Sequence, residues 1–147
     1  MIGVQVNESS LEKSSRNAIT GEIYFQFHEV CFPEPNWNDF VVILLTWWNK
    51  SIRLLETASI GNKVNLYFME GPYYVQGEKR DSENVSLSFI RRNKNNLCIM
   101  YSIETEISSL KKSIVSASNI TLKEIRNKGW INEDVQELIK SLQTTPQ

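Results

Sequence analysis

The side chains best suited to catalysis or metal binding are few in this chain of 147 residues. It has a single histidine, His28, and two cysteines, Cys31 and Cys98. A separation of three positions on a strand places His28 and Cys31 on opposite faces, which argues against a nucleophilic pair. These three residues also lack a recognisable zinc-binding spacing, and no second histidine can complete a histidine-rich site. The sequence therefore predicts no metal site.

Carboxylate pairs and glycine motifs give no stronger indication of catalysis. Glu104 and Glu106 lie two positions apart at an expected strand-to-helix junction, where a solvated helix start explains them better than acid–base catalysis. The six glycines match neither a phosphate-binding loop nor a dinucleotide fingerprint. We therefore expect a protein that is not an enzyme and uses no cofactor.

Acidic residues dominate one stretch of the chain. No Lys or Arg occurs between Arg16 and Lys50, a span that contains Glu22, Glu29, Glu34 and Asp39. One interpretation is a solvated edge with acids at a helix N-terminus, and the other is an electronegative patch for a basic partner. The net charge of −1 and the absence of a basic stripe argue against nucleic acid or an anionic membrane as the partner.

The overall composition is typical of one globular domain. Apolar residues make up 41% of the chain and charged residues 22%. The start, MIGVQVNESS, lacks the basic and apolar regions of a signal peptide. We therefore expect a cytoplasmic protein whose two thiols are reduced and buried, with a Cys31–Cys98 disulfide as the alternative.

The most apolar segment is CFPEPNWNDFVVILLTWW, at positions 31–48. Its run from Phe40 to Trp48 is shorter than the roughly twenty residues that cross a membrane. The apolar pattern continues with helical spacing to Leu55, which predicts a central helix from about 38 to 57. Asn36 or Asn38 is expected to cap this helix. Both Trp47 and Trp48 are expected in the core, with a position at an interface as the alternative.

The remaining periodicity predicts an α+β fold. Strand-like runs occupy 1–8, 21–30, 63–70, 73–78, 84–92 and 97–104, and the polar stretch 7–17 is expected to be a loop. Helical spacing follows from about 106 to Gly129, and Asn132 is expected to cap a last helix. We predict an antiparallel sheet of about five strands packed against three helices, one of them buried and Trp-rich. Residues 1–147 would form a single domain, with 1–20 partly loop and 143–147 a frayed tail.

The segment 21–76 resembles a family of small bacterial immunity proteins that accompany polymorphic toxins, including those of contact-dependent growth inhibition systems. The similarity consists of an aromatic strand, an FPxxxWNDF turn, a hydrophobic helix with paired tryptophans and an FxEGPY strand–turn–strand. The residues that carry it are Phe32, Pro33, Trp37, Asn38, Asp39, Phe40, Trp47, Trp48, Phe68, Glu70, Gly71, Pro72 and Tyr73.

This resemblance implies a cytoplasmic inhibitor without catalysis, which binds the toxic C-terminal domain of a cognate effector, often a nuclease. The motif residues would define the fold, whereas contacts with the toxin differ between family members. Our candidate toxin contacts are the residues of the acidic stretch and its outward strand face: Glu22, Tyr24, His28, Glu29, Glu34 and Asp39. Aromatic residues at strand edges could also support a homodimer.

The alternative function is a small-ligand-binding module, or a minor enzyme, with a pocket between the Trp helix and the sheet, lined by Trp47, Tyr67 and Tyr73.

Overall fold

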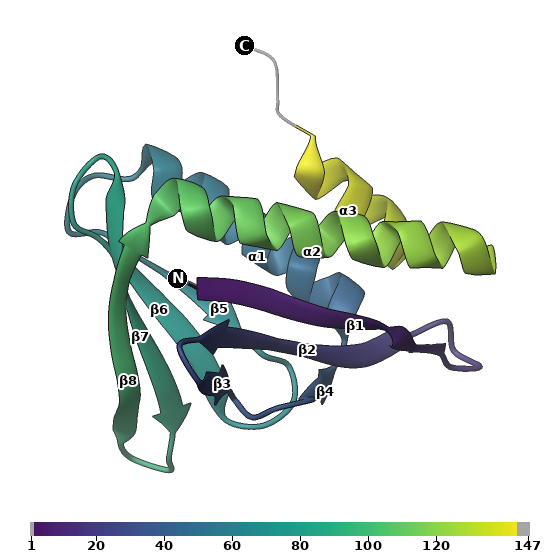
Figure 1. The fold of residues 1–147 in the computed structure, drawn as a ribbon, viewed down its shortest axis with the longest axis horizontal. Coiled ribbons are helices and arrows are strands. Elements are labelled where there is room, and N and C mark those ends of the chain that lie inside the picture. The colour runs from purple at the N-terminus through teal and green to yellow at the C-terminus, as the bar shows by residue number, and fades with distance from the viewer. Residues whose placement is uncertain (1, 144–147) are drawn as a thin grey trace.

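Two antiparallel sheets and three helices make up the fold in the computed structural model, which describes residues 2–143 (Figure 1). The first sheet contains β1 (Ile2–Lys13), β2 (Ile19–Phe27), β3 (Val30–Phe32) and β4 (Asn38–Asp39). The second contains β5 (Lys63–Tyr67), β6 (Tyr73–Lys79), β7 (Asn84–Arg92) and β8 (Leu97–Glu106). The helices are α1 (Val41–Thr57), α2 (Ile107–Lys128) and α3 (Glu133–Leu142).

The α+β class, the three helices and the antiparallel strands agree with the prediction, but the single sheet of about five strands is wrong. Within the described residues there are two four-stranded sheets, and the chain completes the first before α1 and the second after it. Strand β2 pairs with β1 on one side and with both β3 and β4 on the other, so no side of it is left for the later strands. The second sheet is a meander in the order β5-β6-β7-β8, as short turns between consecutive strands favour.

The expected loop at 7–17 is wrong for most of its length, because β1 continues to Lys13. The register between β1 and β2 shifts between Asn7 and Glu12, and a tight turn at 14–18 closes the hairpin. The hydroxyl of Ser14 accepts hydrogen bonds from the backbone N–H groups of Arg16 and Ala18 in this turn. Much of this part of the hairpin is exposed, and its residues are correspondingly polar. The alternation of apolar and polar residues that would predict a strand is therefore missing here.

The Trp-rich segment forms a helix as predicted, but it begins at Val41 and neither expected asparagine caps it. Phe40 holds the N-cap position without a side-chain hydrogen bond, and Asn38 belongs to β4. A carboxylate oxygen of Asp39 accepts a hydrogen bond from the backbone N–H of Phe40 at 2.7 Å. The predicted apolar stripe is confirmed from Val41 onward, since its members are buried: Val41, Leu44, Leu45, Trp48, Ile52 and Leu55.

Trp48 lies at the centre of the core that the two sheets share with α1. Its ring stacks on Phe25 of the first sheet at 4.8 Å between centroids and meets Phe68, which follows β5, edge-on at 5.2 Å. Its indole N–H donates to the backbone carbonyl of Tyr67 at 2.9 Å. Phe27 and Phe89 extend the same contact between the sheets, with ring centroids 4.5 Å apart. One side chain therefore links α1 to both sheets.

The C-terminal helices agree closely with the sequence pattern. Helix α2 ends at Gly129, whose positive φ of 69° is a left-handed conformation that glycine adopts without a Cβ penalty. Asn132 caps α3 as predicted, by accepting a hydrogen bond from the backbone N–H of Val135 at 2.9 Å. The predicted fraying concerns 143–147, and of these only Gln143 lies within the described residues.

The turn between β6 and β7 contains a carboxylate whose protonation the fold disfavours. The pKa of Asp81 is lowered, first because its carboxylate accepts a hydrogen bond from the backbone N–H of Glu83, and then because it accepts from the side chain and backbone of Asn84. A depressed pKa contributes stability above the pKa of the unfolded chain, and this contribution is lost as the pH falls through the lowered value.

The neighbouring tryptophans of α1 provide a matched test of this core. We expect Trp48→Ala to lower the free energy of unfolding by about 3–5 kcal/mol, because it empties a fully buried site. Trp47→Ala should cost about 1 kcal/mol or less, since that ring is 39% exposed. Urea denaturation of the two variants measures both values, and equal losses would contradict the central role of Trp48.

Candidate interaction site

Five of the six candidate contact residues lie on the outward side or the rim of the first sheet. Glu22 and Tyr24 alternate along β2 with the buried Ile23 and Phe25, so they face away from the core. His28 and Glu29 form the two-residue turn between β2 and β3, and Glu34 lies in the loop between β3 and β4. We call this set the acidic face: Glu22, Tyr24, His28, Glu29 and Glu34.

The sixth candidate, Asp39, lies inside the protein and does not belong to the acidic face. Its exposed fraction is 0%, and its carboxylate accepts three hydrogen bonds. One oxygen accepts from the backbone N–H of Phe40, and the other accepts from the indole N–H of Trp37 at 3.0 Å and the backbone N–H of Glu70 at 3.1 Å. The sequence pattern groups Asp39 with the exposed glutamates because charge alone does not distinguish a buried acid that receives hydrogen bonds from a solvated one.

The glutamates of the acidic face have few contacts with other charged or polar side chains in the described part of the chain. None of Glu22, Glu29 and Glu34 forms an ion pair with any residue in 2–143. Glu22 accepts one hydrogen bond, from the side-chain amide of Asn7 at 3.2 Å. Glu22 and Glu29 are seven positions apart along the strand and its turn, so the face extends over roughly 20 Å. Its three carboxylates come from β2, the turn after β2 and the loop after β3.

The structure places His28 and the two cysteines differently from the prediction. His28 is in a turn with a positive φ of 53°, not on the strand, and Cys31 pairs across the hairpin with Gln26. Both thiols are free, as expected, but they are not buried, because Cys31 is half-exposed and Cys98 is exposed. Within 2–143, no group of three or more His, Cys, Asp or Glu side chains is placed to hold a metal ion.

Several of the aromatic residues on which the resemblance rests meet in one cluster. Trp37 contacts Tyr73 and Phe68 edge-on, with centroid distances of 5.4 Å and 6.3 Å, and Phe32 contacts Tyr73 at 5.5 Å. Gly71 has a positive φ of 70°, and a Cβ there would lie 3.0 Å from the Trp37 ring. The motif thus joins the loop after β3 to the turn after β5, and its residues have a structural role.

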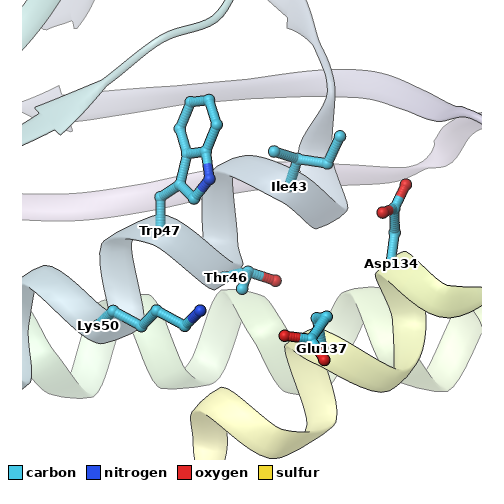
Figure 2. Close-up of a pocket in the computed structure, with 6 residues that line it drawn as sticks. All are labelled: Ile43, Thr46, Trp47, Lys50, Asp134 and Glu137. Carbon is cyan, nitrogen blue, oxygen red and sulfur yellow. The ribbon is translucent and has the colours of Figure 1, made fainter.

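A shallow groove of about 170 Å³ lies elsewhere, between α1 and α3 (Figure 2). Its lining comprises Ile43, Thr46, Trp47 and Lys50 of α1 and Asp134 and Glu137 of α3. Figure 2 shows the two α3 carboxylates on the side of the groove opposite α1. The expected burial of Trp47 is therefore wrong. Trp47 points about 100° away from the buried stripe of α1, and this angle is the signal in the sequence that could have indicated its exposure.

The groove differs from the pocket that the alternative function requires. That pocket was expected between the Trp helix and the sheet, whereas Tyr67 and Tyr73 do not line the groove beside Trp47. Of the two carboxylates that line the groove, that of Glu137 already forms an ion pair with Lys140 at 3.4 Å. The groove is open and is lined partly by charged side chains, so it lacks the enclosed, apolar character of a small-molecule site.

Searches with this chain against protein-family models, curated proteins and solved structures find no match. None of the helices in the described part of the chain has the length and apolar character needed to span a bilayer.

Asp39 offers a direct test of its structural role. We expect Asp39→Asn to lower the free energy of unfolding by about 3 kcal/mol, because an amide N–H₂ replaces one acceptor and faces buried N–H donors. The exposed Glu34→Gln is the matched control, with a change of about 0.5 kcal/mol or less. Chemical denaturation gives both values. Equal stability of the Asn variant and the wild-type protein would show that the three hydrogen bonds contribute little.

Proposed function

We propose that this protein is an immunity protein, which binds the toxic domain of a cognate bacterial effector in the cytoplasm and neutralises it without catalysis. The resemblance of residues 21–76 to the immunity family supports this function. The observation in the structure that carries the proposal is the acidic face, whose glutamates have no cationic partner among residues 2–143. An exposed surface of one sign is suited to bind a surface of the opposite sign.

The partner surface that fits this face is a basic cleft such as that of a nuclease. A nuclease binds the phosphate backbone of its substrate with Lys and Arg side chains. Carboxylates held on β2 and its turn can occupy such a cleft and exclude the substrate electrostatically and sterically. Tyr24 and His28 add an aromatic ring and an imidazole beside these carboxylates, and tyrosine is enriched among residues that dominate binding energy.

The interaction is tested with the toxin domain encoded by the neighbouring upstream gene. Co-expression of this chain should rescue cells from that domain, and the purified proteins should bind each other. We expect Glu22→Lys/Glu29→Lys to slow association and weaken affinity by about tenfold or more, and to reduce the salt dependence, because two attractive charges become repulsive. Stopped-flow or surface plasmon resonance at several salt concentrations measures these effects.

The matched control is Glu83→Lys/Glu133→Lys, which changes the net charge equally at exposed positions outside the acidic face. It should retain nearly the wild-type association rate. If the acidic-face variant binds as fast and as tightly as the wild-type protein, that face is not the interface. Absence of both rescue and binding by the wild-type protein would reject the proposed function itself.

A further inference from the structure

Most edges of the two sheets are covered or short. At β1, the backbone N–H of Val4 donates to the hydroxyl of Ser113 on α2. At β5, the backbone carbonyls of Tyr67 and Asn65 accept hydrogen bonds from Trp48 and Ser51 of α1. The third edge, at β3 and β4, consists of strands of only three and two residues. Such devices prevent pairing with other chains.

Strand β8 is a ten-residue edge strand whose exposed run is apolar, whereas the exposed positions of the longer edge strand β1 are polar. Leu97 is 60% exposed and Ile99 59%, and Met100 and Tyr101 follow them at about 40%. The stretch LCIMYSI, at 97–103, contains no charge, proline or glycine. No side-chain hydrogen bond between β8 and a helix covers this edge within the described residues, apart from the contact of Glu106 with Ser109 at its C-terminal end. In Figure 1 it forms the outer border of the second sheet.

We propose that β8 pairs with β8 of a second copy of this chain, so that the two second sheets join into one continuous sheet across a homodimer. Pairing of two identical edges about a two-fold axis makes the strands antiparallel and the interface isologous. The exposed apolar residues at 97–101 of one copy then meet those of the other. Removal of these apolar side chains from water would stabilise the dimer relative to two separate copies.

The charges at the two ends of β8 are complementary in this arrangement. Glu104 and Glu106 lie at its C-terminal end, whereas Lys94 precedes its N-terminal end. Arg91 lies beside that same end, because it pairs with Cys98 across the β7–β8 ladder. Glu104 is 4.0 Å from Arg80 of the same chain, and Glu106 forms no ion pair within residues 2–143. Antiparallel pairing brings the acidic end of each copy beside the basic end of the other, whereas a parallel arrangement would bring like charges together. This complementarity favours a second copy as the partner.

The strength of the dimer is limited by a bulge in the middle of the strand. The register between β7 and β8 shifts where Phe89 and Ile90 pair with Tyr101 and Ile99, which leaves Met100 as the extra residue. A bulge increases the local twist and interrupts the ladder. The structure therefore points to a reversible dimer that is weaker than an obligate dimer.

The test is the molar mass of the purified chain between about 1 and about 100 µM, measured by sedimentation equilibrium. The wild-type mass should rise from the 17.0 kDa monomer toward the dimer. Ile99→Lys should stay monomeric or raise the dissociation constant at least about tenfold, because charge on an edge strand opposes pairing. The matched control is Ile131→Lys, at a 79% exposed isoleucine between α2 and α3, and it should dimerise like the wild type. Circular dichroism verifies that each variant is folded.

A charge exchange tests the orientation. Lys94→Glu should weaken the dimer, and the addition of Glu106→Lys should restore it, because the exchange re-creates opposite charges across the interface. Lack of restoration would overturn the antiparallel arrangement.

Three results would overturn the homodimer: a wild-type protein that is monomeric at every concentration, an Ile99→Lys variant that dimerises normally, or an Ile131→Lys variant that is equally impaired. A monomeric wild type whose toxin binding is lost in Ile99→Lys would mean that β8 receives a strand of the toxin instead. That result would reject the homodimer and leave the proposed function standing. A normal dimer that binds no toxin would reject only the proposed function.

Discussion

The contact on which the architecture depends is the packing of Trp48 between Phe25 and Phe68, completed by the hydrogen bond from its indole to Tyr67. Within residues 2–143 the two sheets share no ladder of backbone hydrogen bonds, so side chains set their relative position. A large rigid ring suits this role, because it contacts several elements and loses little conformational entropy. The hydrogen bond adds direction, since only one orientation of the indole satisfies both its N–H and its aromatic neighbours.

The motif cluster extends this constraint to the loops. Trp37 packs on Tyr73 and donates to Asp39, while Asp39 also holds the backbone of Glu70 and Phe40. The carboxylate therefore ties the start of α1 to the turn that precedes β6. A buried charge is tolerated here because three N–H donors replace its water. These contacts fix the loop before α1 against the turn before β6, beside the sheet that carries the acidic face.

The sequence predicts well those features that depend on local spacing. The meander strands, the Gly129 terminus and the Asn132 cap follow from alternation, glycine conformation and capping chemistry. It fails where tertiary contacts decide. The long β1 is hidden by its exposed polar residues, and Trp47 and Trp48 differ in burial only because α1 has an open side beside α3. Of the six predicted contact residues, five are exposed or half-exposed, whereas the sixth, Asp39, is buried and could not be separated from them without knowledge of its donors.

The contrast between these carboxylates bears on function. Asp39 obtains all its hydrogen bonds from N–H groups that the fold supplies, so it needs no cation. The hydrogen bonds of Asp39 would be the same if a Lys or Arg occurred between Arg16 and Lys50. Its burial therefore does not explain why this stretch lacks basic residues. Glu29 and Glu34 are exposed and form no ion pair among residues 2–143. Their one-signed character is thus a property of the surface, and the proposed binding of a basic partner would account for it.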